Sequence, residues 1–173
     1  TPSCLVCVND LVVEQSVPEF NALQMPKFFS WRASKWLQMD DWMHFIYTTY
    51  TTPKFATDVR NRVWEGATVT NVCLQLAYHM GFKEVILIGV DHSFATKGRP
   101  NTTVQSEGDD PNHFSAAYFG KGFRWQLPDL ETSEMGYRVA RQAYEKAGRR
   151  VLDATVGGKL DIFEKVNYDS LFG

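Results

Sequence analysis

The most regular hydrophobic pattern in the chain lies between residues 66 and 90. Apolar residues recur there at helical spacing, at Val69, Val72, Cys73, Leu76, Ala77 and Met80. Gly81 then ends the pattern as a helix C-terminal cap does, and an unbroken apolar run follows at Val85–Val90. A strand that is apolar on both faces belongs in the middle of a parallel sheet covered by helices. The pattern therefore predicts a helix from about Gly66 to Met80 and, after it, a central parallel strand.

Shorter patterns on either side predict further elements of both kinds. They are strands at Cys4–Val8, around Phe28 and Phe29, at His44–Tyr50 and at Val151–Ala154, and a helix that begins near Thr132 and is capped by Gly148. This alternation predicts an α/β fold with a Rossmann-like, doubly wound sheet and a mainly parallel core. We expect one domain over residues 1–173, because this length suits a single hydrophobic core.

The segment from residue 92 to about residue 128 has no helical or strand period. It is rich in Gly, Pro, Asn, Asp and Ser. A loop of this length inside a compact domain is usually functional or disordered, and we expect a functional loop here. At the other end of the pattern, the chain starts without Met and opens directly into a strand. We therefore expect it to be a fragment of a longer chain, truncated at its N-terminus.

Composition narrows the class of protein. The formal net charge is −2, whereas a protein that binds nucleic acid polymers normally carries a basic excess. No run of about 18 apolar residues predicts a membrane span, and the first residues lack the features of a signal peptide. Cys4 and Cys7 have the C-x-x-C spacing of redox and zinc sites, but they lie in a predicted strand that points them to opposite faces. We expect structural, reduced thiols and a cytoplasmic protein.

Polar residues follow three of the predicted strands. They are Asn9-Asp10, Asp91-His92-Ser93 and Asp153-Ala154-Thr155. In open α/β sheets, ligands bind outside the carboxyl ends of the strands, so these residues predict a ligand site at that edge. The chain has neither a G-x-G-x-x-G nor a G-x-x-x-x-G-K-[ST] motif, so dinucleotide binding and P-loop chemistry have no motif support.

The start of the main predicted helix is a candidate anion site. Gly66 and Ala67 allow close approach of a ligand, the free N–H groups and the helix dipole favour a diphosphate, and Thr68 adds a hydroxyl. The alternative is a simple helix start without a ligand. Lys121 and Arg124, in the long loop, are candidate contacts for the same anion, although solvated charge is the default for either residue.

Two further residues suggest chemistry. The carboxylate of Asp91 suits a ribose or sugar hydroxyl or a metal, and its alternative role is to cap the loop. His113, within Asn112-His113-Phe114, is a candidate general base for an acceptor hydroxyl, because histidine most often has this role. A surface histidine without function is the alternative. His92 is less persuasive and is expected to point into solvent. Asp109-Asp110 lacks the spacing of a metal site.

Three segments carry a resemblance to a known family. They are GATVTNVCLQLAYHMGFKEVILIGVDHSF, HFSAAYFGKG and ATVGGKLDIFEKVNYDSLF. The chain resembles the Rossmann-like domain of the motility-accessory-factor family, which is linked to flagellin glycosylation and surface-polysaccharide loci. That family is related to the bacterial lipooligosaccharide sialyltransferases and, more distantly, to the archaeal 6-hydroxymethylpterin diphosphokinase.

The sialyltransferase likeness implies an inverting transfer from a CMP-linked, sialic-acid-like sugar to a glycan or protein acceptor, with no essential metal or cofactor. It implies that Asn9 contacts the nucleotide, that Gly66 and Ala67 lie near the donor, that Asp91 binds the ribose or sugar and that His113 is the base. Ser93 stands where the sialyltransferases carry a tyrosine near the donor phosphate. Their Gly-Pro-Ser turn is absent, and the resemblance places it upstream of this chain.

The diphosphokinase branch implies a different donor. A domain of that kind uses ATP and magnesium, and it transfers to a pterin alcohol. A third possibility is a domain that keeps the fold and binds a nucleotide without catalysis. The sequence thus predicts a glycosyltransferase-like domain that binds a nucleotide-activated sugar, with a CMP-sialic-acid-like donor, at the carboxyl edge of a parallel sheet. The diphosphokinase and the non-catalytic nucleotide-binding module are the alternatives.

Overall fold

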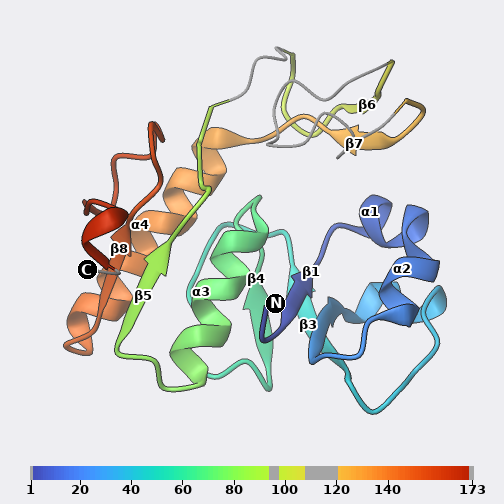
Figure 1. Ribbon diagram of the computed structural model, residues 1–173, viewed down its shortest axis with the longest axis horizontal. Coiled ribbons are helices and arrows are strands. Elements are labelled where there is room, and N and C mark those ends of the chain that lie inside the picture. Colours follow the sequence, from blue (N-terminus) through green and yellow to red (C-terminus); the bar gives the residue numbers. More distant parts are fainter. Residues whose placement is uncertain (1, 94–97, 108–120, 172–173) are drawn as a thin grey trace.

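The computed structural model describes residues 2–93, 98–107 and 121–171, and it has the α/β fold that the pattern predicts. It contains a four-stranded parallel sheet and a three-stranded parallel sheet, with helices packed on both (Figure 1). Within these ranges, no helix is long and apolar enough to cross a membrane.

The four-stranded sheet is formed by the first part of the chain. Its strands follow the order of the sequence: β1 (Leu5–Cys7), β2 (Lys27–Ser30), β3 (Met43–Thr49) and β4 (Arg62–Trp64). Three short helices pack beside it: α1 (Asp10–Gln15), α2 (Val17–Ala22) and the 3-10 helix η1 (Trp31–Lys35). Their apolar side chains form one core with the sheet, made of Val13, Phe20, Phe29, Ala33, Leu37 and Met43. The strands expected around Phe28 and at 44–50 are confirmed, and Asp10, one of the polar residues after the first strand, starts helix α1.

The three-stranded sheet comes from the second part. Its order is β5 (Glu84–Leu87), β8 (Arg150–Asp153), β9 (Glu164–Lys165), and the last described element is the short helix η2 (Asp169–Leu171). The segment expected to be an unbroken loop contains an antiparallel pair, β6 (Thr103–Gln105) with β7 (Arg124–Gln126). Isolated pairs of this kind have weak sequence patterns, because three residues do not establish a period.

Helix α3 (Val69–His79) connects the two sheets and has two buried faces. Val72 and Leu76 pack in a core with residues of β1, β3 and β4. Leu74 belongs to a second core, which includes Tyr144 of helix α4 (Leu130–Lys146) and residues of β5 and β8. Figure 1 shows α3 standing between β5 and the first sheet. The helix is therefore buried on more of its circumference than an amphipathic surface helix.

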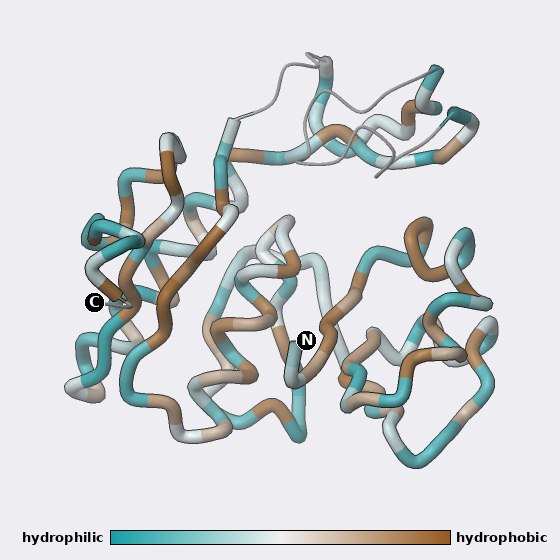
Figure 2. The backbone as a smooth tube through the Cα atoms, in the orientation of Figure 1, coloured by the Kyte–Doolittle hydropathy of each residue, from teal (hydrophilic) through white to brown (hydrophobic). Residues whose placement is uncertain are grey.

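The central position predicted for the strand at 85–90 is wrong. The strand ends at Leu87, and among the described strands it pairs only with β8, at the edge of its sheet. Ile88 is 57 % exposed, and Gly89 turns the chain with a φ of +71°. Figure 2 shows the apolar run along β5. An apolar run indicates that both faces of a strand suit burial, but it does not say which strands lie beside it.

Asn71 holds α3 close to its neighbours. Its side chain is fully buried and donates from Nδ2 to the carbonyl of Trp64 at 2.9 Å. A Cβ on Gly66 would come within 2.7 Å of that nitrogen, and a Cβ on Gly136 of α4 would come within 3.3 Å of the Asn71 side chain. Gly66 also has a φ of +56°, in the left-handed region. Glycine is thus required here for both conformation and space.

Gly66→Ala should therefore destabilise the fold more than the same change at another left-handed glycine. Gly148 is the matched control, since its φ is +65° and a Cβ there would have no neighbour within 4 Å. We expect a loss of about 1–2 kcal/mol for Gly148→Ala from backbone strain alone. For Gly66→Ala we expect about 2–4 kcal/mol, because crowding of Asn71 is added. Urea denaturation measures the unfolding free energy of both variants. Equal losses would show that the Asn71 side chain moves aside at no cost in free energy.

Candidate functional site

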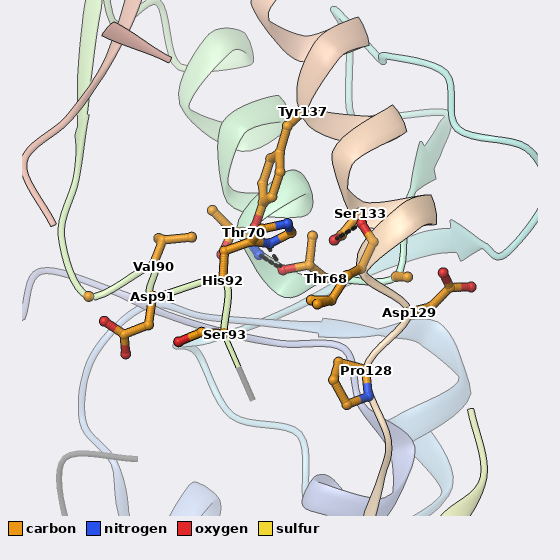
Figure 3. Close-up of a pocket in the computed structure, with 13 residues that line it drawn as sticks. Thr68, Thr70, Val90, Asp91, His92, Ser93, Pro128, Asp129, Ser133 and Tyr137 are labelled. Atoms are coloured by element: carbon orange, nitrogen blue, oxygen red, sulfur yellow. Dashed lines mark hydrogen bonds between the residues drawn. The ribbon is translucent and has the colours of Figure 1, made fainter. Parts of the chain in front are cut away.

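A cavity of about 190 Å³ lies where three segments meet: the start of α3, the chain after β5 and the start of α4 (Figure 3). Its lining residues are Ala67, Thr68, Thr70, Gly89, Val90, Asp91, His92, Ser93, Pro128, Asp129, Leu130, Ser133 and Tyr137. The start of α3 follows β4, and the second segment follows β5. The cavity therefore lies at the carboxyl ends of these two strands, each of which belongs to a parallel sheet. This is the edge at which the sequence predicts a ligand.

The α3 wall is formed by a left-handed turn and a helix start. Gly66 and Ala67 have φ values of +56° and +55°, so the helix begins later than the apolar pattern predicts. Thr68 is the N-cap, and its Oγ1 accepts a hydrogen bond from the Thr70 N–H at 3.2 Å. A positive φ is uncommon for alanine, and residues held in such conformations cluster at ligand sites. The first N–H groups of a helix lack partners within it, so this wall favours an anion.

The α4 wall is a second helix start, but it already holds a negative charge. Asp129 is the N-cap of α4 and accepts from the Thr132 N–H at 3.0 Å and from its hydroxyl at 2.8 Å. A carboxylate in this place neutralises part of the helix dipole. The α3 start has a neutral hydroxyl as its cap, so an anion in the cavity is attracted more strongly to α3 than to α4.

His92 faces the cavity from the segment after β5. Its side chain is only 8 % exposed, and its backbone has a φ of +52°. Nε2 lies 3.1 Å from Oε1 of Glu134, whose other oxygen accepts from Arg138 at 3.2 Å. The hydrogen bond from His92 and, after it, the one from Arg138 lower the pKa of the Glu134 carboxyl. The sequence expectation that His92 points into solvent is wrong.

Tyr137 of α4 connects the two walls. Its hydroxyl lies 3.4 Å from Oγ1 of Thr68, and its ring meets the His92 ring edge-on, with 6.2 Å between the centroids. Burial raises the pKa of the phenol, so Tyr137 stays protonated at neutral pH. Figure 3 shows Tyr137, His92 and Thr68 grouped on one side of the cavity, with Asp91 and Ser93 along the chain that leaves it.

The end of β8 supports this site without lining it. Thr155 Oγ1 accepts from the Val90 N–H at 3.1 Å, and the Lys159 N–H donates to the Asp91 carbonyl at 2.8 Å. Asp153 is buried and pairs with Lys165 at 2.7 Å. The polar residues expected at the end of this strand therefore fix the chain around Asp91.

The structure brings together four of the residues that the sequence singled out: Ala67, Thr68, Asp91 and Ser93 all line the cavity. Gly66 lies beside them, beneath Asn71. Asn9 does not line the cavity: it is the N-cap of α1, and its Oδ1 accepts from the Leu11 and Val12 N–H groups at 3.0 and 3.4 Å.

Two of the expected loop residues, Lys121 and Arg124, are not among the described residues that line the cavity. Arg124 lies in β7, where it binds Glu14 at 2.8 Å and its N–H donates to Gln15, both in α1. Lys121 is exposed in the turn before β7. His113, the predicted general base, lies outside the described residues, so its role stays a prediction.

A polar network joins the carboxyl ends of the first sheet, and the sequence analysis did not find it. Its centre is the Arg32 guanidinium in η1. The guanidinium donates to Asp10 (3.0 Å), Thr48 (2.8 Å), the Val8 carbonyl (3.4 Å) and Glu65 (2.8 Å), and also to the hydroxyl of Tyr50. Burial opposes its charge, but the hydrogen bonds to Asp10 and Glu65 outweigh burial and raise the pKa of Arg32.

Glu65 is the buried carboxylate of this network, 4 % exposed, and it comes directly before the left-handed turn. Burial raises the pKa of its carboxyl, in spite of the hydrogen bonds from Thr48 and Arg32 that lower it. The Thr68 N–H donates to the Glu65 carbonyl at 3.2 Å. Arg32 therefore fixes, through Glu65, the residue from which the α3 wall of the cavity starts.

Neither the cysteines nor the acidic residues suggest other chemistry. Burial raises the pKa of Cys7 and of Cys73 to about 11, so both are poor nucleophiles. In the part of the chain that the structure describes, no group of three His, Cys, Asp or Glu side chains is placed to hold a metal ion.

The comparison with protein families gives one result. A family model described as 6-hydroxymethylpterin diphosphokinase MptE-like matches residues 18–97, fewer than half of the 173 residues. The chain is similar to this family. The match runs from α2 past the end of β5, so it includes the α3 wall and the segment of His92 but not α4. No curated protein and no solved structure matches the chain.

Sequence reasoning missed the α4 wall. Asp129 and Thr132 have the spacing of a helix N-cap with its partner, so the start of α4 was readable. The packing of α4 against α3 could not be predicted from the sequence, since it depends on contacts between residues far apart in the chain. Arg32 gave no signal at all, because an isolated arginine in a polar segment is usually solvated.

Arg32→Lys should destabilise the fold strongly. A lysine has one ammonium group and cannot satisfy the same acceptors, so the buried Glu65 loses its partner. We expect a loss of about 2–4 kcal/mol of unfolding free energy, the usual cost of breaking a partly buried charge network. Arg60→Lys is the control, because Arg60 pairs with Asp58 on the surface, and it should leave the melting temperature unchanged. Similar melting curves for both variants would contradict the role given to Arg32.

Proposed function

We propose that this chain is a nucleotide-binding transferase, that the phosphate groups of its donor bind at the start of α3, and that the donor is ATP. The cavity at two strand ends and a helix N-terminus is the observation that carries the proposal. Helix starts of this kind bind phosphate in many nucleotide-binding proteins. The similarity to 6-hydroxymethylpterin diphosphokinases supports ATP as the donor and a hydroxymethyl pterin as the acceptor.

The size of the cavity supports phosphate groups as its contents. Pockets that enclose a whole drug-sized ligand measure roughly 300–1,000 Å³. At about 190 Å³, this cavity is smaller, so it suits the phosphates while the nucleoside extends beyond it. Thr68 and Ser133 add hydroxyl groups to the lining, and the exposed carboxylate of Asp91 suits a ribose hydroxyl.

Magnesium usually accompanies ATP, and the described side chains do not fit a site that the protein itself would form for it. The carboxylate of Asp129 is engaged by Thr132 through both oxygens. Asp91 is then the one other carboxylate in the lining. We assign no step to a metal held by this chain.

Transfer of a CMP-linked sugar is the competing function, and it rests on the resemblance to the motility-accessory and sialyltransferase families. Its donor also carries a phosphate that suits the α3 start. In this function, Ser93 lies near that phosphate and His113 is the base. The third possibility, a nucleotide-binding module without catalysis, shares the site but predicts no turnover.

A thermal-shift screen separates these functions. We expect ATP, tested with and without magnesium, to stabilise the protein, with about 2.7 kcal/mol at a concentration of 100 times its dissociation constant. CMP, CDP, UDP and GDP should give smaller shifts. If ATP is the donor, we expect release of AMP when 6-hydroxymethylpterin is added. A shift with CMP alone would favour the glycosyltransferase, and ATP binding without AMP release would favour the non-catalytic module.

Two neighbouring variants locate the binding site. Thr70→Trp places a large ring in the cavity and should abolish the stabilisation by ATP. Val69→Trp is the control, since Val69 lies in the same helical turn, is 40 % exposed and does not line the cavity. If both variants keep the ATP shift, the nucleotide binds elsewhere and the proposal is wrong.

A further inference from the structure

The two helix starts supply N–H groups to the cavity but no side chain with a positive charge. Among the lining residues that the structure describes, His92 is the one side chain that can carry a positive charge. Phosphate sites normally combine N–H groups with at least one cationic side chain. The two candidates from the sequence, Lys121 and Arg124, lie outside the lining, and Arg124 is paired with Glu14.

His92 is also held more firmly than a surface histidine. Its side chain is 92 % buried between Tyr137 and Glu134, and it sits on a backbone with a φ of +52° that costs free energy for any residue but glycine. With Nε2 engaged by Glu134, the ring atom that His92 can offer to a ligand is Nδ1. A carboxylate on one ring nitrogen fixes the orientation of the other, as it does in many histidine sites.

We propose that protonated His92 binds a phosphate oxygen of the ligand in this cavity, and that Glu134 is the residue that positions its ring. The inference rests on the proposed function in that it uses the same cavity. It names the side chain that supplies the positive charge beside the start of α3. A bound phosphate then meets the helix N–H groups, Thr68 and the imidazolium on the same side of the cavity (Figure 3).

The charged groups around His92 agree with this role. From α4 they are Glu134, Arg138 and the neutral phenol of Tyr137; from its own segment the charged group is Asp91, which is exposed. Arg138 and Glu134 balance each other, and Asp91 and Asp129 are the two carboxylates of the cavity lining, so protonation of His92 makes the charge around the cavity less negative by one unit. Binding of an anion should therefore take up a proton, and affinity should fall as the pH is raised.

Sulfate is the probe that tests this, because its charge is constant over the pH range in which imidazoles titrate, about 5 to 8. NMR titration of the backbone amides gives its affinity for the cavity at both ends of that range. For the wild type we expect the affinity for sulfate to be roughly 10- to 100-fold weaker at the high-pH end of the range. This factor corresponds to the free energy of one hydrogen bond to a charged group.

His92→Gln should bind sulfate weakly at both ends of the range, with the pH dependence lost. His79→Gln is the matched control: His79 also faces a carboxylate, Asp58, at 3.6 Å, but it lies at the far end of α3. It should behave as the wild type. Glu134→Ala removes the partner that fixes the ring, so it should weaken sulfate binding at the low end of the range, and Glu134→Gln, which keeps a hydrogen-bond acceptor, should restore it. Equal sulfate affinities for Glu134→Ala and the wild type would show that Glu134 does not position the ring.

The outcomes separate this inference from the proposed function. If sulfate and ATP bind at the start of α3 and His92→Gln changes nothing, His92 is not a ligand and the nucleotide site stands. If wild-type binding is independent of pH, the inference is also overturned. If neither anion binds in the cavity, both proposals fail.

Discussion

The contact of Arg32 with Glu65 is the interaction on which the ligand side of this structure depends. The guanidinium joins groups at the carboxyl ends of β1, β3 and β4, and Glu65 is the buried carboxylate among them. A buried carboxylate is stable only when it is paired, so Arg32 determines where the chain leaves β4. The left-handed turn at Gly66 and Ala67, the cap at Thr68 and the direction of α3 all follow from that point. The cavity thus owes one of its walls to an ion pair outside it.

Local patterns predicted those parts of the fold that depend on neighbouring residues. The apolar period of α3, the glycine that ends it and the strands at β2, β3 and β8 are of this kind. The edge position of β5 and the division into two sheets were not predictable, because strand neighbours are chosen by contacts across the whole chain. The same limit applies to the site. Asp91 was found because it follows a predicted strand, and Ala67 because it lies at the start of the predicted helix, whereas Tyr137 reaches the cavity only because α4 packs on α3.

The family similarity and the cavity support each other but cover different parts of the chain. The match ends shortly after the segment of His92, so it contributes two of the three walls. The third wall, from α4, supplies a carboxylate cap and Glu134. It supplies no positive charge to the lining. The two matched walls therefore hold the features that suit phosphate: a helix start with a neutral cap and a histidine that can be protonated. This division explains why the α3 side is the expected place of the donor phosphates.

Amide chemical shifts measured by NMR during addition of ADP test the central claim most directly. The account predicts that the largest changes fall on residues 67–70, at the start of α3, and on residues 89–93, after β5, with smaller changes at the start of α4. Changes confined to the β6–β7 pair, or to Asn9 and Asp10 at the end of β1, would contradict it, because the nucleotide would then occupy a different part of the sheet edge.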